Sequence, residues 1–482
     1  MPSYCRDPRF QGDDGLSEAR DFLTREREKA SDQDLKGILR RTLTNHHLAV
    51  ERNEAHWIDW QVARSLAASW KHDAISRLDS LLEELETNLT ARGTVVHWAS
   101  NADEALDIID TVVRENGVQS VIKGKSMTTE EIGLNEHLEA GAVEVVESDL
   151  GEFIIQLRGE KPFHIITPAM HLTKSDISAL FEEKLDVPHT DDAETLTRAA
   201  RAHMRSRFLQ ADMGITGANF AIANPGLISI TENEGNGILS ASAPRIHLAI
   251  MGIEKVLPQL EQLALFLPLL SHSGTGQFLS CYNSFFGGPR QTGERDGPEQ
   301  FHLVLLDNGR TGILADPEQR ESLQCIRCGA CLNACPIFRN IGGHAYGVTY
   351  QGPIGSVISP NLLGVKEFGH LSFASSLCGK CAEVCPVRIN IHHHLLENRR
   401  NLVKISPPST LERHGFRGYS RTMVSATRYR MAVRFARLGL GMIQRVPFLK
   451  RFGPIQKWTA SRTLPVPART SFLEQVAEER KS

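Results

Sequence analysis

Seven of the nine cysteines lie between Cys325 and Cys385. Four follow the spacing C-x2-C-x2-C-x3-C-P, from Cys325 to Pro336, and three more end in a second Cys-Pro pair at Cys385. This is the spacing of bacterial ferredoxins, in which thiolates on a tight loop converge on one cuboidal cluster while the fourth thiol reaches the neighbouring cluster. The cysteines therefore predict iron–sulfur electron-transfer chemistry.

The same spacing predicts a crossed set of ligands for two clusters. The ligands of the first cluster are Cys325, Cys328, Cys331 and Cys385. The ligands of the second are Cys335, Cys378 and Cys381. Ser375 stands where a further cysteine would complete the second set. We expect a 4Fe–4S cluster at the first site. At the second we expect either 3Fe–4S or 4Fe–4S with an oxygen, solvent or substrate ligand.

A zinc ribbon is the alternative for these cysteines, because a repeated C-x2-C pair also binds zinc. Seven cysteines and two Cys-Pro endings fit zinc poorly, so the iron–sulfur interpretation is favoured. The insert between Cys335 and Cys378 is rich in glycine, proline and aromatic residues, and we expect it to wrap the clusters. Cys5 and Cys281 stand apart and are expected to be ordinary free thiols.

Strand-like and helix-like segments alternate before the cysteines. We expect a leucine-rich helix over residues 75–89 and then strands, separated by helices, at 94–99, 120–124, 143–148, 163–170, 226–234, 245–253 and 301–307. This alternation is typical of a largely parallel sheet with helices on both faces. One α/β domain over residues 71–310 accounts for it.

Two segments of this domain place polar side chains at strand ends. Lys123 and Lys125 lie between a strand and a Ser/Thr-capped helix, an arrangement that suits a small carboxylate or phosphate, although a solvated turn is the alternative. The glycine spacing of neither a Walker loop nor a dinucleotide fingerprint is present. Glu232 and Glu234, two apart on a strand, point to the same side and could act as acid and base or simply face water.

The remaining regions differ in charge. Residues 1–70 are expected to be helical, with no assigned function, and residues 318–398 to form a 4Fe–4S ferredoxin-type domain. A basic extension follows over residues 399–482, and it holds twelve Lys or Arg and no Asp or Glu between Arg413 and Arg462. Four apolar residues fall at helical spacing within it: Met431, Phe435, Leu438 and Met442. We expect it to dock an acidic partner subunit; an anionic membrane surface and a solvated helix are the alternatives.

Composition excludes several classes of protein. The 482 residues exceed one compact core, and 41% hydrophobic residues, 23% charged residues and a net charge of −3 indicate neither disorder nor a nucleic-acid-binding chain. The apolar stretch at Leu263 is too short to span a bilayer, and the first residues lack the apolar run of a signal peptide. Clustered rather than dispersed cysteines argue against a secreted disulfide framework. We expect a cytoplasmic protein.

Four segments together resemble the lactate utilization protein B family, with a likeness that runs from about residue 20 to the end. They are CIRCGACLNACPIFRNIGGHAYGVTYQGPIGSVISP, SSLCGKCAEVCPVRI, VIKGKSMTTEEIGLN and GITGANFAIANPGLISITENEGNG. The resemblance implies a LUD domain, related in fold to ribose-5-phosphate isomerase and formyltetrahydrofolate cyclo-ligase, before an α-helical ferredoxin-like iron–sulfur domain. The family also carries seven ligand cysteines, so Ser375 is no departure from it.

The resemblance further implies a subunit of a three-component system that oxidises L-lactate to pyruvate and allows growth on lactate. The other subunits would be a cysteine-rich A-type component and a second LUD protein, the C-type component. The alternative is an electron-transfer and docking scaffold of another 2-hydroxyacid oxidoreductase complex, with no substrate site of its own. An isomerase-like enzyme with regulatory clusters is disfavoured. Binding of lactate or pyruvate would separate the first two functions.

Overall fold

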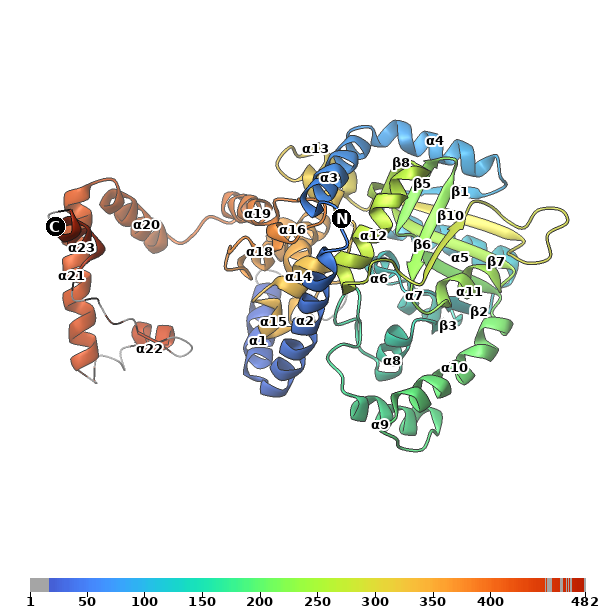
Figure 1. The fold of residues 1–482 in the computed structure, drawn as a ribbon, viewed down its shortest axis with the longest axis horizontal. Coiled ribbons are helices and arrows are strands. Elements are labelled where there is room, and N and C mark those ends of the chain that lie inside the picture. Colours follow the sequence, from blue (N-terminus) through green and yellow to red (C-terminus); the bar gives the residue numbers. More distant parts are fainter. Residues whose placement is uncertain are drawn as a thin grey trace. The chain divides into compact units, whose positions relative to one another are not determined.

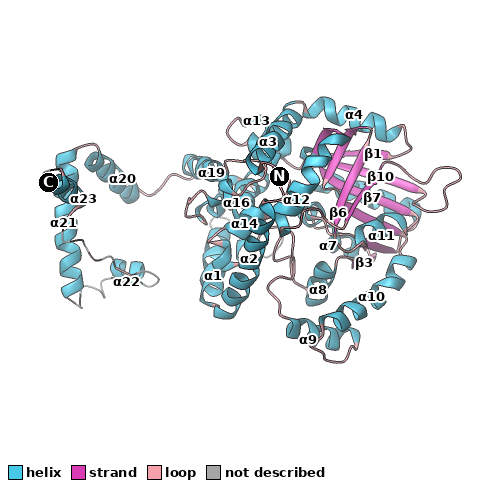
Figure 2. Cartoon of the chain, viewed as in Figure 1, coloured by secondary structure: helices cyan, strands magenta, loops and turns pink. Residues whose placement is uncertain are grey.

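The computed structural model describes residues 17–446, 448, 453–459, 463–464, 466, 468 and 470–480. The chain divides into two compact units, Met1–Ile405 and Ser406–Ser482. Cys5, expected to be a free thiol, lies outside the described residues. Within the first unit, helices surround the strands (Figure 1), and the described strands form two sheets (Figure 2).

Both sheets are built from short strands. The six strands of the larger sheet are all parallel, in the order β1 (Val95–Ala99), β10 (Gln300–Leu306), β7 (Ile246–Gly252), β4 (Met213–Gly217), β2 (Ser120–Lys123) and β3 (Glu144–Glu147). The order in the smaller sheet is β8 (Val256–Gln259), β5 (Phe220–Asn224), β6 (Leu227–Glu232) and β9 (Tyr282–Phe286). In the smaller sheet β5 pairs with β8 in parallel and with β6 in antiparallel fashion. The expected largely parallel α/β fold is confirmed.

Helices cover the sheets. They are α3 (Trp60–Ser76), α4 (Leu78–Thr90), α5 (Ala102–Asn116), α6 (Met127–Ile132), α7 (Leu134–Ala140), α8 (Leu150–Arg158), α9 (Lys174–Leu185), α10 (Ala193–Gln210), α11 (Asn236–Ser242) and α12 (Leu263–Thr275). The strands of the larger sheet are buried on both faces: Leu248 and Ile250 of β7 share a core with α5, whereas Ala249 and Met251 share one with α4 and the smaller sheet. A strand with two buried faces reads as a nearly continuous apolar run, as β7 does apart from His247.

Two sequence expectations for this region are wrong in detail. Residues 163–170, expected to be a strand, form bends and a turn. Phe163 and Ile165 are buried there in a core shared with the cysteine-bearing helices, which explains the apolar run without a strand. The single helix expected over 75–89 is two helices, α3 and α4, which meet at Arg77.

A second core lies around the cysteines. Further helices of the first unit are α1 (Ser17–Ser31), α2 (Gln33–Glu54), α13 (Arg310–Ala315), α14 (Ala330–Ala334), α15 (Phe338–Ile341), α16 (Gly352–Leu363), α17 (Val365–Phe368), α18 (Lys380–Glu383) and α19 (Ile391–Ile405). Leu39 and Leu43 of α2 and Phe266 of α12 are buried in this core together with Leu332 and Phe338. The N-terminal helices therefore cover the cysteine-bearing segment. The domain boundaries expected from sequence stay a prediction.

The second unit is helical in its described residues. Its helices are α20 (Thr410–Met423), α21 (Ala426–Arg445), α22 (Gly453–Thr459) and α23 (Phe472–Glu479). The four residues of the expected stripe all lie on α21 and are 48 to 73% exposed: Met431, Phe435, Leu438 and Met442. Among the helices of the described part of the chain, none is long and apolar enough to cross a membrane.

Candidate functional site

The two cysteine motifs share one turn geometry. A glycine follows a cysteine in each, Gly329 after Cys328 and Gly379 after Cys378, and both glycines are left-handed, with φ of 76° and 80°. Each glycine precedes a one-turn helix, α14 or α18, that carries the next cysteine of the motif. Glycine adopts this backbone conformation without steric cost. The chain thus repeats one tight turn where each C-x2-C pair must converge.

The structure places Cys385 beside the first motif. Burial raises the pKa of Cys328, and the neighbouring Cys385 and Cys325 raise it further. Burial and Cys325 likewise raise the pKa of Cys385, to about 12. Mutual effects of this kind require the thiols to be close neighbours. This is the neighbourhood that the crossed ligand set predicts, and the ligand assignment itself stays a prediction.

The other three cysteines form a second neighbourhood. Burial raises the pKa of Cys381 to about 11, and Cys335 and Cys378 contribute to the rise. Cys378 is exposed, whereas Cys335 and Cys381 are buried. Ser375 is half-buried, and its hydroxyl accepts a hydrogen bond from the backbone N–H of Leu377 over 3.1 Å. The second set of thiols therefore lies closer to solvent than the first.

Both sets of thiols fit an iron–sulfur cluster. Thiolates crowded in a buried site repel one another, and bound iron supplies the positive charge that stabilises them. Backbone N–H groups add to this: Arg327 donates to Cys325 Sγ and Ile389 to Cys385 Sγ, each over 3.4 Å. Hydrogen bonds to the sulfur atoms are among the factors that set a cluster's reduction potential.

Arg64 of α3 connects the N-terminal part of the chain to the last cysteine. Its Nε donates to the carbonyl oxygen of Cys385 over 3.0 Å and its Nη2 to that of Glu383 over 2.6 Å. Arg64 is buried. A charge-assisted hydrogen bond to a carbonyl is stronger than a neutral one, so Arg64 fastens the end of the second motif to α3.

A cavity of about 330 Å³ lies at the carboxyl ends of β2, β4 and β7, close to the first cysteine motif. Lys125 follows β2, Thr216 belongs to β4, and Lys255 follows β7. Arg327 and Tyr350, from the cysteine-bearing segment, complete the wall. The carboxyl ends of parallel strands are the usual place for ligands in such sheets, and this volume suits a small metabolite.

Three of the four residues predicted to bind substrate line this cavity: Lys125, Glu232 and Glu234. Lys125 Nζ donates to the carbonyl oxygen of Ile166 over 2.6 Å. Glu232 caps α11, because its carboxylate accepts hydrogen bonds from the backbone N–H groups of Gly237 and Ile238 over 2.6 and 2.9 Å. Partial burial and Asp149 raise the pKa of Glu234.

Lys123 does not line the cavity. Its side chain is 1% exposed, and Nζ lies 2.7 Å from Glu147 and 3.4 Å from Glu130. These carboxylates raise the pKa of Lys123 although burial opposes them. Lys123 is thus a buried, ion-paired cation between α6 and β3.

Comparisons with known proteins match both the α/β region and the cysteine-bearing segment. The family model of the LUD domain matches residues 82–306, and that of the 4Fe-4S dicluster domain matches residues 321–389. Two proteins named Lactate utilization protein B, from Bacillus velezensis and Bacillus subtilis, are each 40% identical to this chain over 91% of it and over 92% of their own length.

The chain belongs to the lactate utilization protein B family. The expected LUD domain is confirmed, as are iron–sulfur clusters of the 4Fe–4S type. A solved DUF162 family protein from Deinococcus radiodurans is 12% identical over 48% of this chain and 98% of its own, with a TM-score of 0.27, too slight a likeness to use.

Two cations of the cavity in this member of the lactate utilization protein B family were missed by sequence reasoning. Lys255 Nζ donates to the carbonyl oxygen of Ala218 over 2.6 Å, and burial lowers its pKa to about 8 although Glu254 opposes the shift. Arg327 lies inside the first cysteine motif and reaches the cavity from there. Only the folded chain places these two residues together; the single local signal was an arginine between two ligand cysteines.

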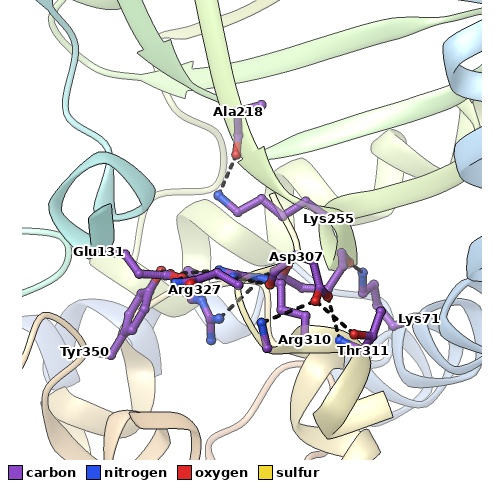
Figure 3. A network of polar contacts seen from close by, with 12 residues as sticks. Lys71, Glu131, Ala218, Lys255, Asp307, Arg310, Thr311, Arg327 and Tyr350 are labelled. Carbon is purple, nitrogen blue, oxygen red and sulfur yellow. Dashed lines mark hydrogen bonds and ion pairs between the residues drawn. The ribbon is translucent and has the colours of Figure 1, made fainter. Parts of the chain in front are cut away.

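A buried network holds Arg327 (Figure 3). Glu254 accepts a hydrogen bond from Arg310 Nε over 2.6 Å and one from Arg327 Nη2 over 3.3 Å. Glu131 accepts two from Arg310, over 2.9 and 2.8 Å, and one from the hydroxyl of Tyr350 over 2.6 Å. Burial acts to raise the pKa of Glu254, but Arg310 and Arg327 lower it to about 2. The network ties the LUD domain to the cysteine-bearing segment through charges that stay ionised.

Proposed function

We propose that the protein is the iron–sulfur electron-transfer subunit of a multicomponent system that oxidises L-lactate to pyruvate and so allows growth on lactate. One observation carries the proposal: the cavity adjoins the first cysteine motif. Arg327 of that motif lines the cavity, and a Cβ added at Gly274, another lining residue, would lie 3.0 Å from the carbonyl oxygen of Cys328. A small ligand there would lie next to the first cluster.

Lactate oxidation needs a site that binds the substrate and a route for the released electrons, and the cavity and the clusters would supply them. Oxidation of lactate to pyruvate releases an electron pair and two protons, and paired clusters offer a route by which electrons leave the site. The names of the relatives support lactate as the donor. The crossed ligand sets would hold the two clusters: Cys325, Cys328, Cys331 and Cys385 for the first, and Cys335, Cys378 and Cys381 for the second.

We further propose that the partners are a cysteine-rich A-type component and a C-type LUD component. The basic second unit, with its exposed apolar stripe on α21, would dock one of them. The cytoplasm suits such a system, since clustered reduced thiols persist in a reducing compartment.

The decisive experiment is anaerobic purification of the protein with its native partners, followed by metal analysis and lactate titration. About eight irons with matching sulfide are expected for two 4Fe–4S clusters. Lactate should reduce the clusters, as seen by electron paramagnetic resonance, and pyruvate should appear. Cys281→Ser, a change at an exposed thiol outside both sets, should leave the iron content unaltered.

Two results would contradict the proposal. Zinc without sulfide would exclude iron–sulfur chemistry. Clusters that lactate does not reduce, in a protein that binds neither lactate nor pyruvate at millimolar concentration, would favour the scaffold of another 2-hydroxyacid oxidoreductase complex.

A further inference from the structure

Arg327 belongs to two sites at once. We propose that its guanidinium binds the carboxylate of the ligand in the cavity and thereby couples ligand binding to the reduction potential of the first cluster. The inference rests on the proposed function for the class of ligand, a small 2-hydroxy or 2-oxo monocarboxylate. It adds a residue, a binding mode and a consequence for electron transfer.

The backbone of Arg327 is part of the cysteine turn. Its φ is 60°, and its N–H donates to Cys325 Sγ over 3.4 Å. The side chain, 12% exposed, leaves the turn and reaches the cavity wall. One residue therefore contacts a cluster ligand through its backbone and the cavity through its side chain.

The guanidinium of Arg327 is held in place, but not all of its N–H groups donate hydrogen bonds. Nη2 donates to Glu254 over 3.3 Å, and the guanidinium carbon lies 4.7 Å from the ring centroid of Tyr350. Nη1 is buried and has no hydrogen-bond partner among the residues that the structure describes. A buried donor left unpaired is costly, so the guanidinium has a hydrogen-bonding capacity that its contact with Glu254 does not use. Arginine presents its N–H groups in a fixed fork that matches a carboxylate.

The charged residues of the cavity wall favour one orientation of a bound ligand. Besides burial, the positive charge of Arg327 contributes to lowering the pKa of Lys255, so these two cations of the cavity wall lie near each other, at the end next to the first motif. Burial, Asp149 and Glu232 raise the pKa of Glu234, against Lys125, and all four residues line the cavity. A 2-hydroxyacid has one anionic end and one neutral hydroxyl, so its carboxylate is drawn to the cationic end and its hydroxyl lies toward the carboxylates.

Charge then links the two sites. A bound carboxylate offsets the positive charge of Arg327, which lies next to Cys325, whereas reduction adds negative charge to the cluster that Cys325 is expected to bind. The two negative charges disfavour each other, so a bound anion lowers the reduction potential of the first cluster. By linkage, the reduced protein binds the anion more weakly by the same free energy. A tenfold difference in affinity corresponds to about 59 mV for one electron.

The test is a redox titration of the full-length, cluster-loaded protein, followed by electron paramagnetic resonance of the first cluster. Pyruvate should lower its midpoint potential, and pyruvamide, which has the same shape without the carboxylate charge, should not. Arg327→Gln should bind pyruvate at least tenfold more weakly by calorimetry and lose the shift. Arg388→Gln is the matched control: Arg388 is exposed, three residues after Cys385, and does not line the cavity, so the pyruvate-induced shift should persist.

The outcomes separate this inference from the proposed function. Equal shifts with pyruvate and pyruvamide in the wild-type protein would overturn the inference without any variant. So would an iron-loaded Arg327→Gln protein that keeps wild-type affinity and shift, while the proposed function would stand. A wild-type protein that binds neither pyruvate nor lactate would instead defeat the proposed function, and the inference with it.

Discussion

The guanidinium of Arg327 lies over the ring of Tyr350, with 4.7 Å between the guanidinium carbon and the ring centroid. The hydroxyl of Tyr350 donates to Glu131 over 2.6 Å, so the ring itself is fixed from the LUD domain. A cation held over an aromatic face and shielded from water is stabilised by the ring quadrupole. The insert between the cysteine motifs, from which Tyr350 comes, thus orients a side chain of the first motif.

Replacing Glu254 by Gln should destabilise the protein strongly. Arg310 and Arg327 would lose a buried carboxylate, and breaking one partner of a buried ion pair costs about 3–5 kcal/mol. Denaturant unfolding measures the change. Glu194→Gln is the control, because Glu194 pairs with Arg198 on the surface of α10 and should leave stability unaltered. Equal stability of the two variants would show that the network is dispensable.

Cys328→Ser and Cys381→Ser should have opposite effects on the two clusters. The first variant should lose the first cluster and retain the second, and the second variant should do the reverse, because the two thiols lie in different neighbourhoods. Electron paramagnetic resonance of the reduced proteins distinguishes the two signals. Loss of both signals in each variant would instead indicate one shared unit or collapse of the fold.

Lys123→Ala and Lys125→Ala should separate stability from binding. The first change leaves Glu147 buried without its cation and should cost about 3–5 kcal/mol of stability. The second removes a cation of the cavity wall and should weaken pyruvate binding with little loss of stability. Unfolding and calorimetry on both variants check this. Weakened binding in a fully stable Lys123→Ala protein would instead support the predicted role of Lys123 in substrate binding.

Binding of pyruvate should weaken as pH rises through about 8. Burial, Arg327 and Arg310 lower the pKa of Lys255 to about 8, against Glu254 and Glu131. Below that pH Lys255 is an ammonium that attracts the carboxylate, and above it the attraction is lost. The affinity should then fall by up to about tenfold per pH unit. Calorimetry from pH 7 to 9.5 measures the effect.

The control for this pH dependence uses a second lysine. The pKa of Lys71 is also lowered to about 8 by burial, but Lys71 donates to the backbone of Glu254 and does not line the cavity. Lys71→Gln should keep the pH dependence, and Lys255→Gln should abolish it. The reverse pattern would show that Lys71, and not Lys255, causes the pH dependence, and would contradict the prediction.

Truncation after Ile405 should leave both clusters intact and abolish copurification with the other components, and with it lactate oxidation. The boundary of the two compact units falls at this residue, and all seven clustered cysteines precede it. Iron analysis and pull-down with the partners test the prediction. A truncated protein that assembles and turns over lactate at the full rate would show that the basic extension is not the docking element.

Local patterns predicted much of this fold. The strands around Ile122, Val145, Leu248 and Leu303 all read as apolar runs between helices, and the ferredoxin spacing placed the cysteines. β4 and β5 were not predicted, because glycine, threonine and asparagine in GITGANFAIAN are typical of turns. In the structure, pairing with neighbouring strands on both sides holds these two segments extended. The strand predicted at residues 163–170 is wrong because a loop buried against the cysteine-bearing helices needs the same apolar residues as a strand.

The candidate site was only half predictable. Lys125, Glu232 and Glu234 stand at strand ends, where local sequence suggests polar contacts. Lys123 stands at one too, but the partners that bury it lie on β3 and α6, and no local pattern reveals which of two neighbouring lysines faces a cavity. Arg327 gains its role from contacts with residues far away in the chain.

The hydrogen bonds of Arg64 to the carbonyl oxygens of Glu383 and Cys385 span more than three hundred residues of sequence. A growing chain emerges from the ribosome with α3 long before the last cysteine motif has been made. Because the predicted ligand set of the first cluster includes Cys385 as well as Cys325, that cluster would be complete only after nearly the whole first unit has been synthesised. Cluster delivery would then be a late event in the synthesis of each chain.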